Sequence, residues 1–219
     1  MGGAVLERTA LLAEGLQAFL AEWGATRLGA AWLDPRCEEA GRALAAREAA
    51  RGVVQGALAG GAGLLVARMT HAIPAIAPHW AIVPLAVATV DAAVVSVRDE
   101  MLLRGVVLRV AGDRPRPFAL VATALASVAW RLGVQGEAGV PLVDLLGEAA
   151  AGAWFGALWL RHRGGVVAWG AHTAWLMVAT AAGVSPSALT GSWGVSIPLI
   201  AALAFTLRPE TSAAPEAVG

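Results

Sequence analysis

Long apolar stretches, each close to the length of a membrane-crossing helix, dominate the chain after residue 51. A helix that spans a bilayer needs roughly 20 apolar residues, and residues typical of turns separate the stretches. The pattern therefore predicts an all-α fold, a polytopic membrane helix bundle with about six transmembrane helices. The predicted spans are residues 52–69, 80–108, 117–134, 139–160, 164–183 and 193–207.

The composition agrees with a membrane protein. Hydrophobic residues make up 58% of the 219 residues and charged residues 15%, whereas about a quarter of the residues in a soluble domain are charged. The formal net charge of zero gives no sign of nucleic-acid binding, so the expected partner is the lipid bilayer and we expect no nucleic acid.

The first 51 residues are more polar, with six Arg and seven acidic residues. Apolar positions in "LERTALLAEGLQAFLAEWG" recur at helical spacing, and "DPRCEEAGRALAAREAARG" predicts a second, more polar helix. We expect residues 1–51 to form a cytoplasmic amphipathic helical segment, residues 52–207 the transmembrane domain, and residues 208–219 a disordered tail.

Connections with arginine and connections without it alternate along the predicted spans. Arginine residues occur in the segment 1–51, the loop 109–116, the turn 161–163 and at residue 208, but not in the loops 70–79, 135–139 and 184–192. Arg68 and Arg131, near the outer ends of their spans, are exceptions. The positive-inside rule then predicts a multi-pass protein of the inner (cytoplasmic) membrane with both termini cytoplasmic.

The stretch "VVSVRDEMLLRGVVLRV" places four charged residues inside the second predicted span. Glu100 and Arg104 are four residues apart, on one helix face, where they can form an ion pair. Asp99 lies about 100° around the helix from Glu100. An ionisable residue inside a membrane indicates a functional site. The alternative is that these charges lie at the cytoplasmic interface and extend to water.

Two motifs carry a family resemblance. "DEMLLRG" resembles the EExxxRG motif of the CPBP family, the CAAX-protease and bacteriocin-processing proteins also called Abi, which include the Ras-converting CAAX endopeptidase. "GEAAAGAWFGALWLRHRGGVVAWGAHTAW" is similar to the family's later signature, in which a basic turn precedes a helix with HxxxN. The resemblance covers roughly residues 80–205 and implies a CPBP-like transmembrane domain. A myxosortase-like branch that trims surface anchors is an alternative within the family, as are bacteriocin maturation and self-immunity.

The resemblance also implies site residues. Asp99 occupies the position of the family's first Glu, which is thought to activate water, and Glu100 the position of the second. Arg104 corresponds to the motif Arg and His172 to the His of HxxxN. Hydrolysis needs an activated water, a proton donor and charge stabilisation at the oxyanion. Asp99 or Glu100 fits as base, Arg104 as its orienting partner and His172 as oxyanion donor.

The chain departs from the family at three more positions. Leu176 replaces the Asn of HxxxN, and "SVAWR" replaces the middle motif FxxxH, with Ser127 for Phe and Arg131 for His. The chain contains no Asn. Candidate substitutes for the missing amide are Thr173, Gln135, Trp169 and Trp175.

Distances along the sequence support the grouping of these residues. Residues 100 and 131 are almost equally far from the turn at Pro115, so they have similar depth in an antiparallel hairpin. His172 follows its turn by eight residues, which is about 12 Å along a helix. The same counting predicts an ion pair between Arg131 and Asp144, with Glu148 as second choice, or a bridge by Arg131 from Asp144 to the Asp99/Glu100 cluster. The alternative is that Arg131 extends to the outer surface.

A catalytic zinc site needs three protein ligands and an open position. Arg131 cannot act as a ligand, so we predict no metal or other cofactor, with zinc as the alternative. The predicted function is an intramembrane endopeptidase that hydrolyses a peptide bond in a lipidated or membrane-anchored protein or peptide. A catalytically silent relative that binds a membrane partner as a scaffold is the main alternative. A small transporter is a weaker one, since the chain shows no internal repeat.

Overall fold

The computed structural model describes residues 2–32, 41–71, 73, 82–135, 140–184 and 193–208. Within these ranges all regular structure is helical, which confirms the all-α class. The elements are α1 (Gly2–Arg27), α2 (Gly41–Met69), α3 (Ile82–Glu100), η2 (Met101–Val106), α4 (Val107–Ala111), α5 (Arg116–Gln135), α6 (Leu142–His162), α7 (Val166–Ala181) and α9 (Trp193–Leu207).

One described helix, Gly41–Met69, is both long and apolar enough to cross a membrane. The apolar helices Val166–Ala181 and Ser196–Leu207 are shorter. The number of six transmembrane helices therefore stays a prediction, although a helix lies in each of the six predicted ranges.

Helix α2 differs most from the sequence-based expectation. It begins at Gly41 and continues to Met69 without a break, so the expected boundary at residue 52 falls inside one helix. Ala-rich sequence such as "ALAAREAARG" favours a helix even where it carries charges. The helix therefore extends from the polar segment into the apolar one. The expected tail after residue 208 lies outside the described residues.

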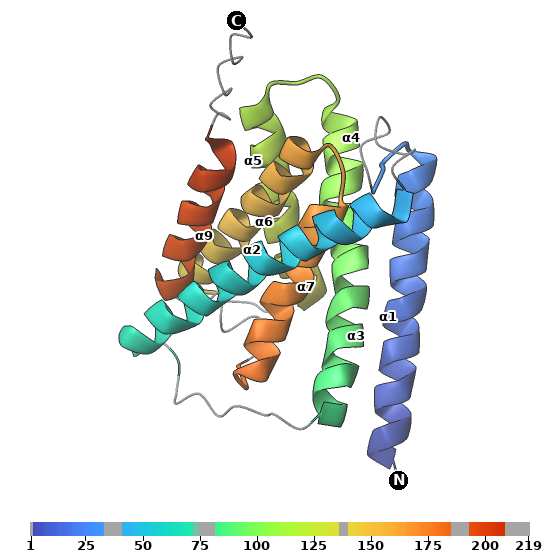
Figure 1. Ribbon diagram of the computed structural model, residues 1–219, viewed down its shortest axis with the longest axis vertical. Helices are drawn as coiled ribbons and strands as arrows, with labels where there is room; N and C mark the ends of the chain where they lie inside the picture. The colour runs from blue at the N-terminus through green and yellow to red at the C-terminus, as the bar shows by residue number, and fades with distance from the viewer. Residues whose placement is uncertain are drawn as a thin grey trace, which may run out of the picture.

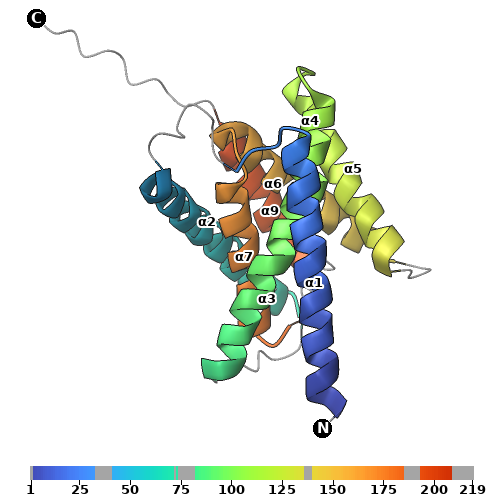
Figure 2. The ribbon, with the colours of Figure 1, turned by 90° about the vertical axis from the view of Figure 1, so that its right-hand side faces the viewer.

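The helices form a bundle in which α3, η2 and α4 follow one another along one rod (Figure 1). Helix α1 lies beside α3 in both views (Figures 1 and 2). Helix α2 crosses obliquely over α7 toward α9 (Figure 1). The start of α1 and the end of α9 lie at opposite ends of the bundle (Figure 1). The expectation that both termini are on the cytoplasmic side stays a prediction.

Glycine residues bring α2 and α7 into backbone contact. A Cβ atom on Gly52 would overlap the carbonyl oxygen of Val167, and one on Gly56 would overlap that of Ala171. A Cβ atom on Gly170 would lie 2.5 Å from the carbonyl oxygen of Ala49. Small residues at such positions allow close helix packing within membranes. This contact fixes the position of the first half of α7, which carries His172.

Candidate active site

Glu100, the last residue of α3, is the centre of a buried polar cluster. Its side chain is fully buried. One carboxylate oxygen, Oε1, lies 2.9 Å from Nδ1 of His172, and the other, Oε2, accepts a hydrogen bond of 2.9 Å from the indole Nε1 of Trp159. A buried carboxylate requires such partners because it has lost the hydrogen bonds of water.

Arg104 supplies the opposite charge. Its Nη1 lies 3.3 Å from Oε1 of Glu100, so the ion pair expected from the i, i+4 spacing is confirmed. Its Nη2 donates a hydrogen bond of 3.1 Å to Oγ of Ser127 on α5. Arg104 is only 3% exposed. Glu100 and Arg104 are therefore buried, and they do not extend to water as the alternative reading supposed.

The backbone around Arg104 has an unusual conformation. Residues Met101–Val106 form a π-helical segment, η2, between the α-helical segments α3 and α4. Single π-helical turns are rare and frequently occur at functional sites. In this case the wider turn lies directly after Glu100 and contains Arg104, so it sets the spacing of the two charges.

Aromatic side chains hold the remaining faces of the cluster. Phe155 stacks on the His172 ring at 4.7 Å between centroids, and the guanidinium of Arg104 lies 5.1 Å from the Phe155 ring. Trp154 stacks on Phe155 in turn, at 4.9 Å. The His172 ring is thus fixed by a hydrogen bond at one edge and by a ring on one face.

Glycine residues of α6 make room for this arrangement. A Cβ atom on Gly152 would lie 2.5 Å from Oγ of Ser127, and one on Gly156 would lie 2.5 Å from Oγ1 of Thr123. Helix α6 therefore packs closely on α5. The small-residue-rich sequence that resembles the family signature has a direct use here, since it brings Ser127 and Phe155 to Arg104.

The hydrogen bonds also indicate how the two nitrogen atoms of His172 are used. Glu100, when ionised, only accepts, so Nδ1 of His172 carries the proton of their shared bond. In the neutral ring Nε2 then has a free lone pair. No described residue bonds to Nε2. Both oxygens of Glu100, by contrast, already accept hydrogen bonds, from His172 and Trp159, and the carboxylate also pairs with Arg104.

Asp99 does not join this cluster. Its carboxylate pairs with Nε of Arg98 at 2.7 Å, and the two side chains are 14% and 15% exposed. Arg98 also donates a hydrogen bond of 3.3 Å to Gln17 on α1. Only the backbone oxygen of Asp99 approaches the cluster, as an acceptor at 3.5 Å from Arg104. Consecutive residues of a helix point about 100° apart, so Asp99 faces α1 while Glu100 faces α6 and α7.

The predicted ion pair between Arg131 and Asp144 is absent from the described part of the chain, and so is a bridge from Arg131 to Glu100. Arg131 is 8% exposed, and its buried Nε atom has no hydrogen-bond partner there. Asp144 lies in the first turn of α6, where the helix dipole stabilises an acidic residue without a cation. Equal depth was therefore not sufficient to predict the pair.

The proposed substitutes for the missing Asn differ in their surroundings. Oγ1 of Thr173 is buried without a hydrogen-bond partner, whereas the indole N–H of Trp169 already donates to the backbone oxygen of Ala93 at 3.0 Å. Trp175 is 3% exposed and belongs to the hydrophobic core, and Leu176 packs against that core. The side chain of Gln135 lies outside the described residues. Thr173 is therefore the candidate with an unused polar group.

Trp159 is the residue of the cluster that the sequence did not reveal. Sequence analysis offers no signal that separates it from the other eight Trp residues, some of which lie near helix ends as membrane-interface residues do. Among the described residues no group of three His, Cys, Asp or Glu side chains is placed to hold a metal ion. The expected lack of a cofactor stays a prediction.

Comparison with known families identifies this part of the chain. Residues 78–178 match the family model described as Rce1-like, the type II CAAX prenyl endopeptidases. Residues 78–178 are thus similar to an Rce1-like domain. The match is consistent with the CPBP family, so the resemblance read from the two motifs is confirmed. The matched range contains both Glu100 and His172. No curated protein and no solved structure matches the chain.

The Rce1-like family is membrane-embedded and generally consists of proteases. This supports a membrane protein of the protease kind. The residues that the Rce1-like domain contributes to the cluster come from α3, η2, α5, α6 and α7. The family match alone does not assign roles to these side chains.

Proposed function

We propose that this protein is a membrane-embedded endopeptidase that cleaves a peptide bond in a prenylated, otherwise lipidated or membrane-anchored protein or peptide. The observation that carries the proposal is the contact between Glu100 and His172, at 2.9 Å, inside an Rce1-like domain. Arg104 and Trp159 complete the surroundings of the carboxylate. Charged groups are costly to bury within a membrane, so an intact cluster supports a catalytic use.

In the proposed mechanism Glu100 orients His172, and His172 activates water. Nε2 of His172 accepts a proton from a water molecule, whose oxygen forms a bond to the carbonyl carbon of the substrate. The imidazolium is stabilised by the carboxylate of Glu100. It then gives its proton to the leaving nitrogen as the C–N bond breaks. The engagement of both Glu100 oxygens supports this division of roles over a carboxylate base.

The sequence-based assignment, with a carboxylate as base and His172 as oxyanion donor, predicts a different response to His172→Gln. A glutamine retains an N–H donor but cannot act as a base at neutral pH. If His172 is the base, the rate falls by about 10²–10⁴-fold. If His172 only donates to the oxyanion, much of the rate survives in His172→Gln and is lost in His172→Ala.

We also propose that the bundle spans the inner (cytoplasmic) membrane. Several large apolar side chains on its surface support this, among them Leu58 and Leu65 of α2, Leu125 of α5 and Phe205 of α9, each more than 60% exposed. Extensive apolar surface marks a membrane or an interaction site. The end with the 109–116 loop and the 161–163 turn would face the cytoplasm, by the distribution of Arg.

The test uses the full-length protein reconstituted in lipid vesicles. A farnesylated peptide with a C-terminal CAAX sequence is offered beside the same peptide without the lipid, and cleavage is followed by mass spectrometry. We expect cleavage by the wild type and none by Glu100→Gln or His172→Ala. Asp99→Asn is the matched control, since its carboxylate lies outside the cluster, and we expect it to retain cleavage.

A second readout does not depend on the choice of peptide. The terminal peptides of membrane proteins are compared between cells that produce the wild-type protein and cells that produce the Glu100→Gln variant. New termini that require Glu100 would identify the substrate. Equal termini in both strains, together with no peptide cleavage in vesicles, would contradict an endopeptidase.

The silent relative remains the second candidate. The observations that favour it are Arg131 at the middle motif and Leu176 at the HxxxN position, where neither supplies the group that the family uses. A silent relative would bind the CAAX peptide with equal affinity in the wild type and in Glu100→Gln, and would cleave it in neither.

A further inference from the structure

The segment that follows α1, residues 28–32, lies outside the range that matches the Rce1-like family model, yet it contacts the start of α7. The backbone N–H of Gly165 donates to the carbonyl oxygen of Ala31 at 3.3 Å. The backbone N–H of Val166 donates to the carbonyl oxygen of Trp32 at 3.0 Å. The first N–H groups of a helix have no partner within the helix, so this segment caps α7. Figure 2 shows the chain running from the end of α1 toward α7.

The side chain of Trp32 packs against Trp159, the residue whose indole donates to Glu100. The two ring centroids are 6.4 Å apart and the ring planes are inclined by 33°, an arrangement in which aromatic rings attract each other. Gly165 lies against both rings, since a Cβ atom on it would lie 2.5 Å from the Trp159 ring and 2.9 Å from the Trp32 ring. The ring of Trp159 is therefore confined by Trp32 and by the backbone at Gly165.

Trp32 is itself held by a polar contact. Its indole Nε1 donates to Oε1 of Glu22 at 2.8 Å, and this bond joins the segment 28–32 to α1. A hydrogen bond to an ionised carboxylate is stronger than one between neutral groups. The described contacts thus form a continuous series that begins at Glu22, passes through Trp32 and Trp159, and ends at Glu100.

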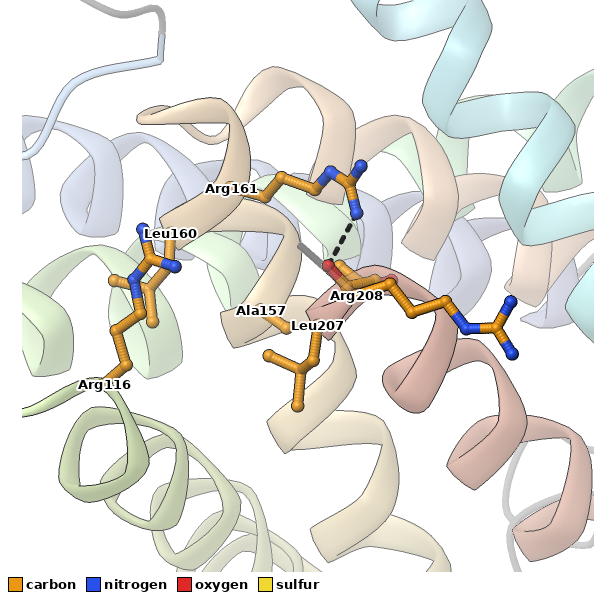
Figure 3. A pocket seen from close by; sticks show the side chains of 7 residues that line it. Arg116, Ala157, Leu160, Arg161, Leu207 and Arg208 are labelled. Atoms are coloured by element: carbon orange, nitrogen blue, oxygen red, sulfur yellow. Dashed lines mark hydrogen bonds between the residues drawn. The ribbon is translucent and has the colours of Figure 1, made fainter. Parts of the chain in front are cut away.

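The end of α6, which carries Trp159, is also held by α9. Nη1 of Arg161 donates to the backbone oxygen of Thr206 at 2.7 Å, as Figure 3 shows. This bond fixes the end of the helix, whereas a tryptophan side chain can still rotate about two of its own bonds. The direction of the Trp159 indole N–H therefore depends on the groups against which the ring packs, and Trp32 is one of them.

We propose that Trp32 is a positioning residue of the candidate active site. By packing on Trp159 it keeps the indole N–H directed at Oε2 of Glu100, and Glu100 thereby keeps its orientation toward His172. The site then includes a side chain from outside the Rce1-like range, residues 78–178. The expected effect of Trp32 on cleavage rests on the proposed function, whereas its effect on the indole hydrogen bond does not.

The first test observes the Trp159 indole directly, by nuclear magnetic resonance of the full-length protein with isotope-labelled tryptophan in detergent. The chain has nine Trp residues, and Trp159→Phe identifies the N–H signal that belongs to Trp159. We expect Trp32→Ala to shift this signal and to speed the exchange of its proton with water about tenfold, because an aromatic contact is lost. Trp32→Phe retains a ring and should keep both properties close to those of the wild type.

Trp23→Ala is the matched control for the loss of a tryptophan from the N-terminal part of the chain. Trp23 lies on α1, is 55% exposed and packs against the guanidinium of Arg27. We expect Trp23→Ala to leave the Trp159 signal, its proton exchange and the cleavage rate as they are in the wild type.

The second test uses cleavage kinetics in lipid vesicles to separate positioning from a role in folding. Because Trp32 acts through Trp159, Trp32→Ala should lower kcat about tenfold and leave KM near its wild-type value. In a protein that already carries Trp159→Phe, Trp32→Ala should lower kcat little further. A role in folding alone predicts that the two losses multiply.

The two measurements distinguish a failure of this proposal from a failure of the proposed function. An unchanged Trp159 signal in Trp32→Ala, or an equal change in Trp23→Ala, would overturn the positioning role whether or not a peptide is cleaved. Losses in kcat that multiply in the double variant would also overturn it. A signal that shifts in Trp32→Ala and is restored in Trp32→Phe supports the role even without cleavage, and only the proposed function would then fail.

Discussion

Asp99 and Glu100 are neighbours in the sequence, yet they belong to two different regions of the molecule. Asp99 lies between α3 and α1, where it pairs with Arg98 and both side chains keep about 15% exposure. Glu100 lies between α3, α6 and α7 and is fully buried. It accepts hydrogen bonds from His172 and Trp159 and forms an ion pair with Arg104. Two adjacent carboxylates thus have very different surroundings.

Burial, and not charge alone, determines how much each carboxylate contributes to the free energy of unfolding. A partly exposed ion pair contributes about 0–1 kcal/mol, because water screens it and the side chains lose freedom. Removal of one partner from a buried pair costs about 3–5 kcal/mol, because the other charge remains without compensation. The Glu100 region is therefore where both stability and chemistry are concentrated.

The largest expected difference in stability is between the two variants in which one carboxylate is replaced by its amide. Glu100→Gln leaves the buried Arg104 without a counter-charge, and we expect it to lower the free energy of unfolding by about 3–5 kcal/mol. Asp99→Asn should lower it by no more than about 1 kcal/mol. Thermal unfolding in detergent measures both. Similar losses in the two variants would contradict the difference between the regions.

The next effect concerns the two indole donors. Trp159→Phe removes a hydrogen bond to a carboxylate, which is worth about 1.5–3 kcal/mol. Trp169→Phe is the control, since its indole donates to the neutral backbone oxygen of Ala93 and should cost about 0.5–1.5 kcal/mol. Trp159→Phe alone should also reduce cleavage. If Trp159→Phe and Trp169→Phe lowered stability and cleavage equally, the charge of Glu100 would add nothing to the strength of the Trp159 hydrogen bond.

The third effect tests how α7 is positioned on the Glu100 side. Gly56→Ala inserts a methyl group against the backbone of Ala171, one residue before His172, and overpacking costs about 1–3 kcal/mol. Gly61→Ala is the control in the same helix, since nothing lies within 4 Å of its added Cβ atom. We expect Gly61→Ala to be neutral or slightly stabilising. Cleavage should fall in Gly56→Ala only.

The smallest effect lies outside both regions, where His162 of α6 contacts Glu48 of α2 at 3.0 Å. Burial lowers the pKa of His162 below its ordinary value of 6.5; nearby Glu48 raises it, while Arg51 and Arg161 lower it further, and the net direction is down. The unfolded chain therefore takes up this proton at a higher pH than the folded protein. Stability should fall as the pH decreases from 6.5 through the lower pKa of the folded state.

His162→Gln should remove this part of the pH dependence. Thermal unfolding measured between about pH 5 and pH 8, the range in which histidine side chains change charge, tests this. The comparison of Glu100→Gln with Asp99→Asn should be unaffected by it. An unchanged pH dependence in His162→Gln would assign the effect to other groups.

Much of the fold was accessible from the sequence, because local patterns determine where these helices begin and end. The predicted span 117–134 corresponds to α5 (Arg116–Gln135) and 193–207 to α9 (Trp193–Leu207). Turn residues such as Pro115 and the RHRGG sequence interrupt the helices locally. The polar helix before residue 52 was predicted, but its continuation into the apolar segment as one helix, Gly41–Met69, was not.

Only part of the candidate site could be predicted from the sequence. The pairing of Glu100 with Arg104 follows from a spacing of four residues within one helix. The pair of Arg131 and Asp144 failed because depth in a bundle does not fix the direction in which a side chain points. Trp159 could not have been found, since its bond to Glu100 joins residues 59 positions apart.

The sequence by itself thus determined the helices, the buried ion pair and the family resemblance, all of which depend on residues close together in the chain or on quoted motifs. Only the tertiary structure decided which of two adjacent carboxylates meets His172 and which indole donates to it. The physical reason is that these contacts depend on how each helix is rotated about its axis. That rotation is set by packing, as between Gly56 and Ala171, and not by the period of the sequence.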